Sequence, residues 1–235
     1  YSRYLLASEE IEPGGGWDYG SLFSALAADA SISGGELGKA VCDGYYAKCK
    51  KSGKEAAATL SVTDLQKLPA LTGAFDTLAA EMAENAAQPK GIQAIAQSAK
   101  NAQKFGGTSS NEGFSNLADL RHFAENAVDL EGSRELTAAV DQAVVYKVGG
   151  PQKSKSGGLS FYYPAHVEAN KLKSYYDGIC PSEPYKTYLQ SVYSKMPSEP
   201  IVFEDYGSVR EDGSFGIKLS ESSRNYVLSI DFLLV

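Results

Sequence analysis

Three cysteines and two histidines are the residues that could supply a nucleophile and a general base. Cys42 and Cys49 lie seven positions apart on an expected helix, which separates them by about 10 Å along its axis. A disulfide needs Cα atoms within about 7 Å of each other, so we expect two small buried residues instead. Cys180 lies in an expected loop, and none of the three has surroundings that would lower the pKa of a thiol.

The two histidines lie in separate segments of the chain. His122 falls within a helix expected at 117–128, and His166 follows Pro164 at the start of another expected helix. A general base is one role for each, but a solvent-exposed or helix-capping histidine is the more common one. Neither has cysteines or carboxylates at the spacing of a zinc site. The sequence therefore predicts no nucleophile–base pair within this chain.

The strongest local signal is a Gly-rich loop that carries four acidic residues: Glu9, Glu10, Glu12 and Asp18. The loop follows a strand expected at 4–7, and in open α/β sheets ligands bind at the carboxyl ends of the strands. Carboxylates in such a loop suit a guanidinium or ammonium group. A solvated acidic turn is the alternative, and Asp18 is also suited to cap the helix that follows.

The elements that would position this loop alternate between strands and helices. Apolar runs predict buried strands at 4–7, 59–62, 144–148 and 159–163. Helical spacing predicts helices after Asp18, at 33–51, after Asp64, and at 86–104, 117–128, 134–143, 165–176 and 183–196. In the helix after Asp18, we expect Leu22, Phe23, Leu26 and Ala27 to form one apolar face. This alternation predicts the end of an α/β domain over residues 1–196.

The pattern changes near the C-terminus. Pro197 and Pro200 mark a linker, and strand-like runs follow at 201–203, 215–219 and 226–235, with turn residues between them. We therefore expect residues 197–235 to begin a small antiparallel β-rich domain. Strands at both ends of the chain suggest a piece of a longer polypeptide.

Charge and hydropathy exclude two classes of partner. A net charge of −7 argues against nonspecific nucleic-acid binding, which needs a basic face. No apolar stretch approaches the roughly 18 residues that span a bilayer, and no secretory signal is visible.

Residues 4–19, which read YLLASEEIEPGGGWDY, resemble the segment just after the nucleophile strand in clostripain-family cysteine peptidases. That family belongs to the caspase-like clan. Three further segments match in the family's order: 58–65, 143–146 and 157–164. The resemblance implies that the chain is the second half of a caspase-like α/β/α sandwich, followed by the β-rich domain.

The same resemblance places the catalytic residues outside this chain. In the family, a histidine in a His-Gly context and a cysteine in an Asp-Ala-Cys context both precede the Ala-Ser-Glu-Glu segment, and the cysteines and histidines of this chain match neither position. The resemblance therefore implies part of an endopeptidase that cleaves after Arg or Lys, with the upstream segment as its partner.

The remaining implications concern recognition and setting. The resemblance implies that a basic side chain of a peptide or protein substrate is bound by residues of the acidic loop, namely Asp18, Glu9, Glu10, Glu12 and Trp17. The chemistry requires no cofactor, the resemblance allows calcium, and it implies a secreted or cell-surface location. A different class of function stays open: a non-catalytic binding or surface-attachment protein that uses the acidic loop.

Overall fold

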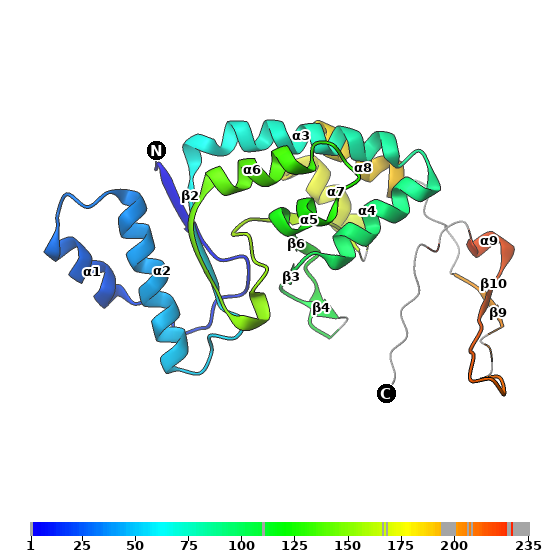
Figure 1. The fold of residues 1–235 in the computed structure, drawn as a ribbon, viewed down its shortest axis with the longest axis horizontal. Coiled ribbons are helices and arrows are strands. Elements are labelled where there is room, and N and C mark those ends of the chain that lie inside the picture. The colour runs from blue at the N-terminus through cyan, green and yellow to red at the C-terminus, as the bar shows by residue number, and fades with distance from the viewer. Residues whose placement is uncertain are drawn as a thin grey trace.

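The structure is a computed structural model that describes residues 2–109, 111–165, 167, 169–193, 201–205, 207, 209–224 and 227 (Figure 1). The helices are α1 (Tyr19–Ala28), α2 (Gly34–Lys51), α3 (Leu68–Asn85), α4 (Pro89–Asn101), α5 (Leu120–Asn126), α6 (Ser133–Ala143), α7 (Ala169–Gly178), α8 (Glu183–Tyr193) and α9 (Glu221–Arg224), with 3₁₀ turns at Leu65–Lys67 and Pro151–Lys153. The strands are β1 (Tyr4–Ala7), β2 (Thr59–Asp64), β3 (Lys104–Phe105), β4 (Thr108–Ser109), β5 (Gly113–Phe114), β6 (Leu117–Asp119), β7 (Val144–Gly149), β8 (Ser160–Tyr162), β9 (Phe203–Asp205) and β10 (Lys218–Leu219).

Among the described residues, the principal sheet has the strand order β1-β2-β7, and both pairings are antiparallel. Leu6 lies opposite Val62, and Leu60 lies opposite Val148. Because β1 and β7 are both antiparallel to β2, they run in the same direction. The carboxyl ends of β1 and β7 therefore meet at one edge of the sheet, where the acidic loop begins.

The two faces of β2 differ in chemistry, although the strand is buried along its whole length. Leu60 and Val62 belong to an apolar cluster with α2. On the opposite face, Ser61 Oγ donates to the carbonyl of Gly158 at 2.7 Å. The segment after β7 therefore returns across the polar face of the sheet rather than projecting from it.

A second, larger core contains α3, α4, α5, α6 and α8, and α3 packs against both α6 and α8 (Figure 1). Tyr185 and Tyr188 of α8 are fully buried there, and Phe161 of β8 contacts Phe75, Phe123 and Tyr185. The strands β3, β6 and β8 form a small antiparallel sheet beside this core. The described chain is thus a mixed α/β fold, as the sequence predicts.

Several helices begin at the capping residues that the sequence predicts. The side chain of Asp18 accepts from the Gly20 amide, Ser33 accepts from the Glu36 amide, and Asp64 accepts from the Gln66 amide. These contacts span two or three residues, so they can be read from sequence alone.

Four expectations about particular segments are wrong. The helix expected at 117–128 begins only at Leu120, because Asp119 ends β6 and its carboxylate caps α5 through the His122 amide at 2.6 Å. The helix expected over 86–104 runs only from Pro89 to Asn101, and Lys104 already begins β3. Leu5 of β1 and Phe23 of α1 were expected to be buried, but they are 48% and 63% exposed, because the described chain covers only one side of each element.

The β-rich region is described in part. β9 and β10 pair in an antiparallel two-stranded sheet that is separate from β1-β2-β7. Residues 194–200, which contain the expected linker, and most of 226–235 lie outside the described residues. The boundary between 196 and 197 therefore stays a prediction. No helix in the described part of the chain has the length and apolar character that a membrane crossing needs.

The close approach of α2 to β2 yields a stability prediction. A Cβ added to Gly38 of α2 would lie 2.8 Å from both γ-methyl carbons of Val62, whereas one added to Gly73 of α3 would meet nothing within 4 Å. Gly38→Ala should therefore lower the free energy of unfolding by about 1–3 kcal/mol through overpacking. Gly73→Ala, the matched control, should raise it by up to about 1 kcal/mol through helix propensity. Urea unfolding measures both, and equal effects would contradict this packing.

Candidate functional site

The acidic loop is attached to the sheet at the carboxyl end of β1. Ser8 Oγ lies 2.9 Å from Thr59 Oγ1, and the Glu10 amide donates to the same Thr59 oxygen at 3.1 Å. The first residues of the loop therefore have a fixed position beside the start of β2. From there, Glu9 and Glu10 extend to different partners.

Glu9 lies beneath the segment that follows β7. Its side chain is only 8% exposed, and its Oε2 accepts from the Ser156 hydroxyl and, at 2.9 Å, from the Gly158 amide. Burial raises the pKa of Glu9 to about 8, and the neighbouring carboxylate of Asp119 adds to that increase. Glu9 is thus part of the interior.

Glu10 forms an ion pair at the edge of the sheet. Its Oε2 lies 2.6 Å from Lys153 Nζ, and its Oε1 accepts from the Gly106 amide at 3.0 Å. Partial burial acts to raise the pKa of Glu10, but the hydrogen bonds from Lys153 and the backbone amides outweigh it, so the net shift is downward. This carboxylate stays ionised and links the loop to both the β7–β8 and β3–β4 connections.

The glycines of the loop are held against α2. Lys48 Nζ donates to the carbonyls of Gly15 at 2.6 Å and Trp17 at 3.1 Å. The Trp17 ring packs on the α2 cluster, and its Nε1 donates to Glu12 Oε2 at 2.9 Å. Glu12 and Trp17 therefore form one unit in which the indole orients the carboxylate.

Asp18 ends the loop as the N-cap of α1. Its Oδ1 accepts from the Gly20 amide at 3.2 Å and its Oδ2 accepts from Ser21 Oγ at 2.6 Å. The hydrogen bond from Ser21 is the largest cause of a lowered pKa for Asp18. The four acids therefore do not share one partner: Glu9 points into the interior and Glu10 to Lys153, while Glu12 and Asp18 belong to the outer part of the loop.

None of the three cysteines lies in a reactive setting. Cys42, Cys49 and Cys180 are free and buried, and burial raises the pKa of Cys42 to about 12. His122 Nδ1 accepts a hydrogen bond from the backbone amide of Gln103 at 3.1 Å, so this ring nitrogen is already bonded to the backbone. Among the residues that the structure describes, no thiol is paired with an imidazole; His166 lies outside them.

Three residues of the site are not predicted from the sequence. Asp119, Ser156 and Lys153 all contact the first acids of the loop, and they lie more than 100 positions away in the sequence. A hint for Asp119 is its position before an apolar helical stretch, which suits an N-cap. Within the described ranges, no group of three or more His, Cys, Asp or Glu side chains could hold a metal ion, and calcium stays an expectation.

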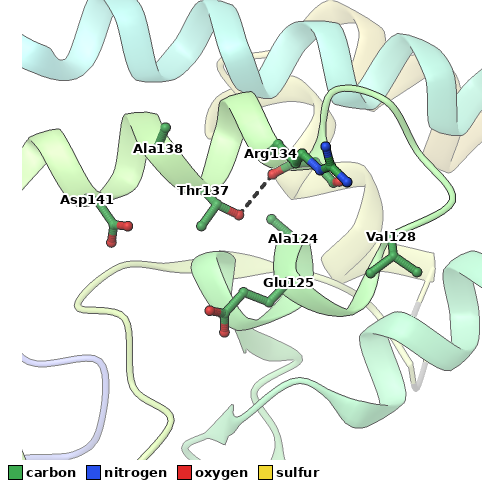
Figure 2. Close-up of a pocket in the computed structure, with 8 residues that line it drawn as sticks. Ala124, Glu125, Val128, Arg134, Thr137, Ala138 and Asp141 are labelled. Carbon is green, nitrogen blue, oxygen red and sulfur yellow. Dashed lines mark hydrogen bonds between the residues drawn. The ribbon is translucent and has the colours of Figure 1, made fainter.

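A separate groove lies between α5 and α6 (Figure 2). Its lining includes Glu125 and Asp141, and both carboxylates bind the Arg121 guanidinium, at 2.5 and 2.6 Å. The single Arg121 guanidinium therefore already occupies both carboxylates, and no residue of the acidic loop lines this groove. The edge at the ends of β1 and β7 is the better candidate site.

Comparison with known proteins agrees with the expected family. The family model described as the clostripain family matches residues 1–200. No curated protein matches the chain.

Three solved structures are similar to 79% of the chain. They are an inactive zymogen C11 protease from Parabacteroides distasonis (19% identity, TM-score 0.55, 51% of that chain covered), a secreted C11 cysteine protease from Bacteroides thetaiotaomicron with an irreversible peptide inhibitor (16%, 0.53, 52%), and a clostripain from Bacteroides thetaiotaomicron with the peptide inhibitor BTN-VLTK-AOMK (16%, 0.51, 76%). The chain spans about half the length of the first two. At these identities the likeness establishes the fold.

The contact between Lys48 and the glycine loop can be tested directly. Lys48→Met keeps the aliphatic stem but removes the donor to the Gly15 and Trp17 carbonyls, so the loop should become several-fold more susceptible to limited proteolysis. Lys50→Met is the matched control, because Lys50 lies over the Tyr46 ring and carries the same charge. Equal cleavage rates at residues 13–17 in the two variants would contradict the anchoring role.

Proposed function

Because the chain belongs to the clostripain family, we propose that it is part of a cysteine endopeptidase that cleaves peptides after Arg or Lys. The cysteine-peptidase class follows from the family. We add a preference for Arg or Lys, and we place the catalytic cysteine and histidine in sequence upstream of this chain. The observation that carries it is the acidic, glycine-rich loop at the edge where β1 and β7 end.

The outer half of that loop suits a basic side chain. Glu12 and Asp18 are only partly exposed, and each is oriented by a neutral donor: the Trp17 indole for Glu12 and the Ser21 hydroxyl for Asp18. Neither carboxylate forms an ion pair among the described residues, although the nearby Lys48 ammonium contributes to the lowered pKa of Asp18. A guanidinium or ammonium group that enters this region would therefore gain charge-assisted hydrogen bonds.

A named inhibitor of one related structure agrees with a basic preference. The clostripain from Bacteroides thetaiotaomicron is described with BTN-VLTK-AOMK, in which a lysine adjoins the AOMK group. For this chain we extend the same preference to arginine, because a planar guanidinium can bind two carboxylate oxygens at once.

In the proposed reaction, a cysteine thiolate supplied by sequence upstream of this chain attacks the scissile carbonyl carbon. A histidine from the same upstream segment protonates the leaving amine as the C–N bond breaks, and water then releases the acyl group from the sulfur. Backbone amides stabilise the oxyanion. This chain contributes part of the sheet and one wall of the specificity pocket, through Glu12, Trp17 and Asp18.

A location and an alternative class of function accompany this proposal. One of the related structures is a secreted protease, which supports a secreted or cell-surface location. The other candidate class is a non-catalytic binding or surface-attachment protein that would use the same acidic, glycine-rich loop. The sequence that precedes Tyr1 in the gene separates the two, since a peptidase requires a His-Gly and an Asp-Ala-Cys segment there.

The 235-residue chain by itself should hydrolyse no peptide. Its three thiols are buried, and the one described histidine is bonded to backbone, so no thiol is activated by an imidazole among the described residues. Fluorogenic Arg and Lys substrates measure this, and co-expression with the upstream segment should restore turnover. Turnover by the chain alone that survives Cys42→Ala, Cys49→Ala and Cys180→Ala together would contradict the placement of the catalytic residues upstream of this chain.

Asp18 should matter more for substrate choice than for folding in the intact peptidase. Asp18→Asn keeps most of the capping ability but removes the charge, so kcat/KM for Arg substrates should fall by roughly 10²-fold. The control is Asp29→Asn, because Asp29 lies at the other end of α1 and is exposed, and its side chain bonds only to Ser31 among the described residues. If Asp18→Asn retains activity while Asp18→Ala lowers the melting temperature, Asp18 is only a helix cap, and Glu12 becomes the better pocket acid.

A further inference from the structure

Two buried carboxyl groups bind three consecutive residues after β7. Glu9 Oε2 accepts from the Ser156 hydroxyl and the Gly158 amide, while Asp119 Oδ2 accepts from the Gly157 amide between them. Asp119 is completely buried, and its Oδ1 also caps α5 through the His122 amide. The end of β1, the end of β6 and the segment after β7 therefore meet at this pair.

The backbone here leaves no room for side chains. A Cβ on Gly157 would lie 2.6 Å from Arg121 Cβ and 2.8 Å from Asp119 Oδ1, and Gly158 has a φ of +98°. Glycine at both positions lets the amides approach the carboxyl oxygens closely. The two glycines therefore allow direct contact between the carboxyl groups and the backbone.

One carboxyl oxygen of this pair lacks a hydrogen-bond partner. Glu9 Oε1 is buried and accepts no hydrogen bond, and the carboxyl groups of Glu9 and Asp119 are neighbours because they bind the adjacent amides of Gly158 and Gly157. An ionised carboxylate can only accept, so a hydrogen bond between two of them requires a proton. Two adjacent carboxylates in a buried site also repel, and one shared proton removes that repulsion.

The charged groups around the pair are bonded elsewhere. Lys153 pairs with Glu10, Lys147 Nζ donates to the Ser156 carbonyl, and Arg121 pairs with Asp141 and Glu125. Lys104 Nζ donates to the Ala99 carbonyl, and the His122 imidazole accepts from Gln103. Among the described residues, no cation therefore neutralises Glu9 or Asp119, which leaves a proton as the available compensating charge.

We propose that Glu9 and Asp119 share a single proton, and that this pair positions the acidic loop by holding the end of β1 against residues 156–158. Glu9 is followed directly by Glu10, whose carboxylate faces Lys153 and Gly106. The two successive acids fix the start of the loop from two directions. Glu9 and Asp119 are therefore positioning residues, and their effect on substrate recognition rests on the proposed function above.

The shared proton gives the contact a defined pH dependence. The pKa of Glu9 is raised from an ordinary 4.5 to about 8, first by burial and then by Asp119. Between these values the folded chain holds a proton that the unfolded chain has lost, so stability falls as pH rises through this window. Above about pH 8 the proton leaves, and two buried carboxylates face each other without compensation.

Thermal unfolding of the 235-residue chain between pH 5.5 and 9.5 tests the proposal without any activity measurement. Glu9→Gln presents an amide N–H donor where Glu9 carries the proton, so its melting temperature should match the unsubstituted chain near pH 6 and exceed it by several degrees at pH 9.5. Glu9→Ala should be less stable at every pH, because the Ser156 and Gly158 donors lose their acceptor. Glu10→Gln is the matched control: it should keep the downward slope, since the pKa of Glu10 is lowered and lies outside this window.

Hydrogen exchange at the Gly157 and Gly158 amides provides a second readout. In the unsubstituted chain, protection of these amides should drop above pH 8, and in Glu9→Gln it should not. A Glu9→Gln variant with the same pH slope as the unsubstituted chain, or as unstable as Glu9→Ala at pH 6, would overturn the shared proton. In the intact peptidase, identical pH profiles of Arg cleavage for the unsubstituted and Glu9→Gln enzymes, combined with the expected melting curves, would instead count against the role of the loop in substrate binding.

Discussion

The contact of Glu9 and Asp119 with residues 156–158 is the interaction on which the arrangement of the site depends. It joins three segments that are distant in sequence: the end of β1, the end of β6 and the connection from β7 to β8. Each segment alone would leave polar groups buried without partners, which costs more than an ordinary hydrogen bond contributes. Together they satisfy one another, and the acidic loop leaves the sheet from a fixed point.

Strand direction explains why this edge can form a site. β2 runs against both of its neighbours, so β1 and β7 point the same way and deliver their following segments to one edge. The polar residues of β2 on that side, Ser61 and Thr59, bind those segments, while Leu60 and Val62 on the other side pack on α2. One strand thus supplies an apolar face for the core and a polar face for the site.

The charges of the loop are distributed by burial. Glu9 is buried deepest and has a raised pKa, whereas Glu10, partly buried beside Lys153, has a lowered one. Glu12 and Asp18 are oriented by neutral donors on the outer loop. Four acids within ten positions of sequence therefore have different surroundings, and the two on the outer loop form no ion pair among the described residues.

The sequence by itself determined the features whose causes are local. Asp18, Ser33 and Asp64 cap helices within three residues of themselves, the spacing of Cys42 and Cys49 excludes a disulfide between them, and the motif at residues 4–19 identifies the family. The tertiary structure alone decided that Glu9 is interior, that Trp17 orients Glu12, and that Asp119 belongs to the site. Glu9 and Ser156 are 147 positions apart, and no local preference brings such residues together. Their contact exists because antiparallel pairing places two strand ends at one edge, and because buried polar groups there must find partners.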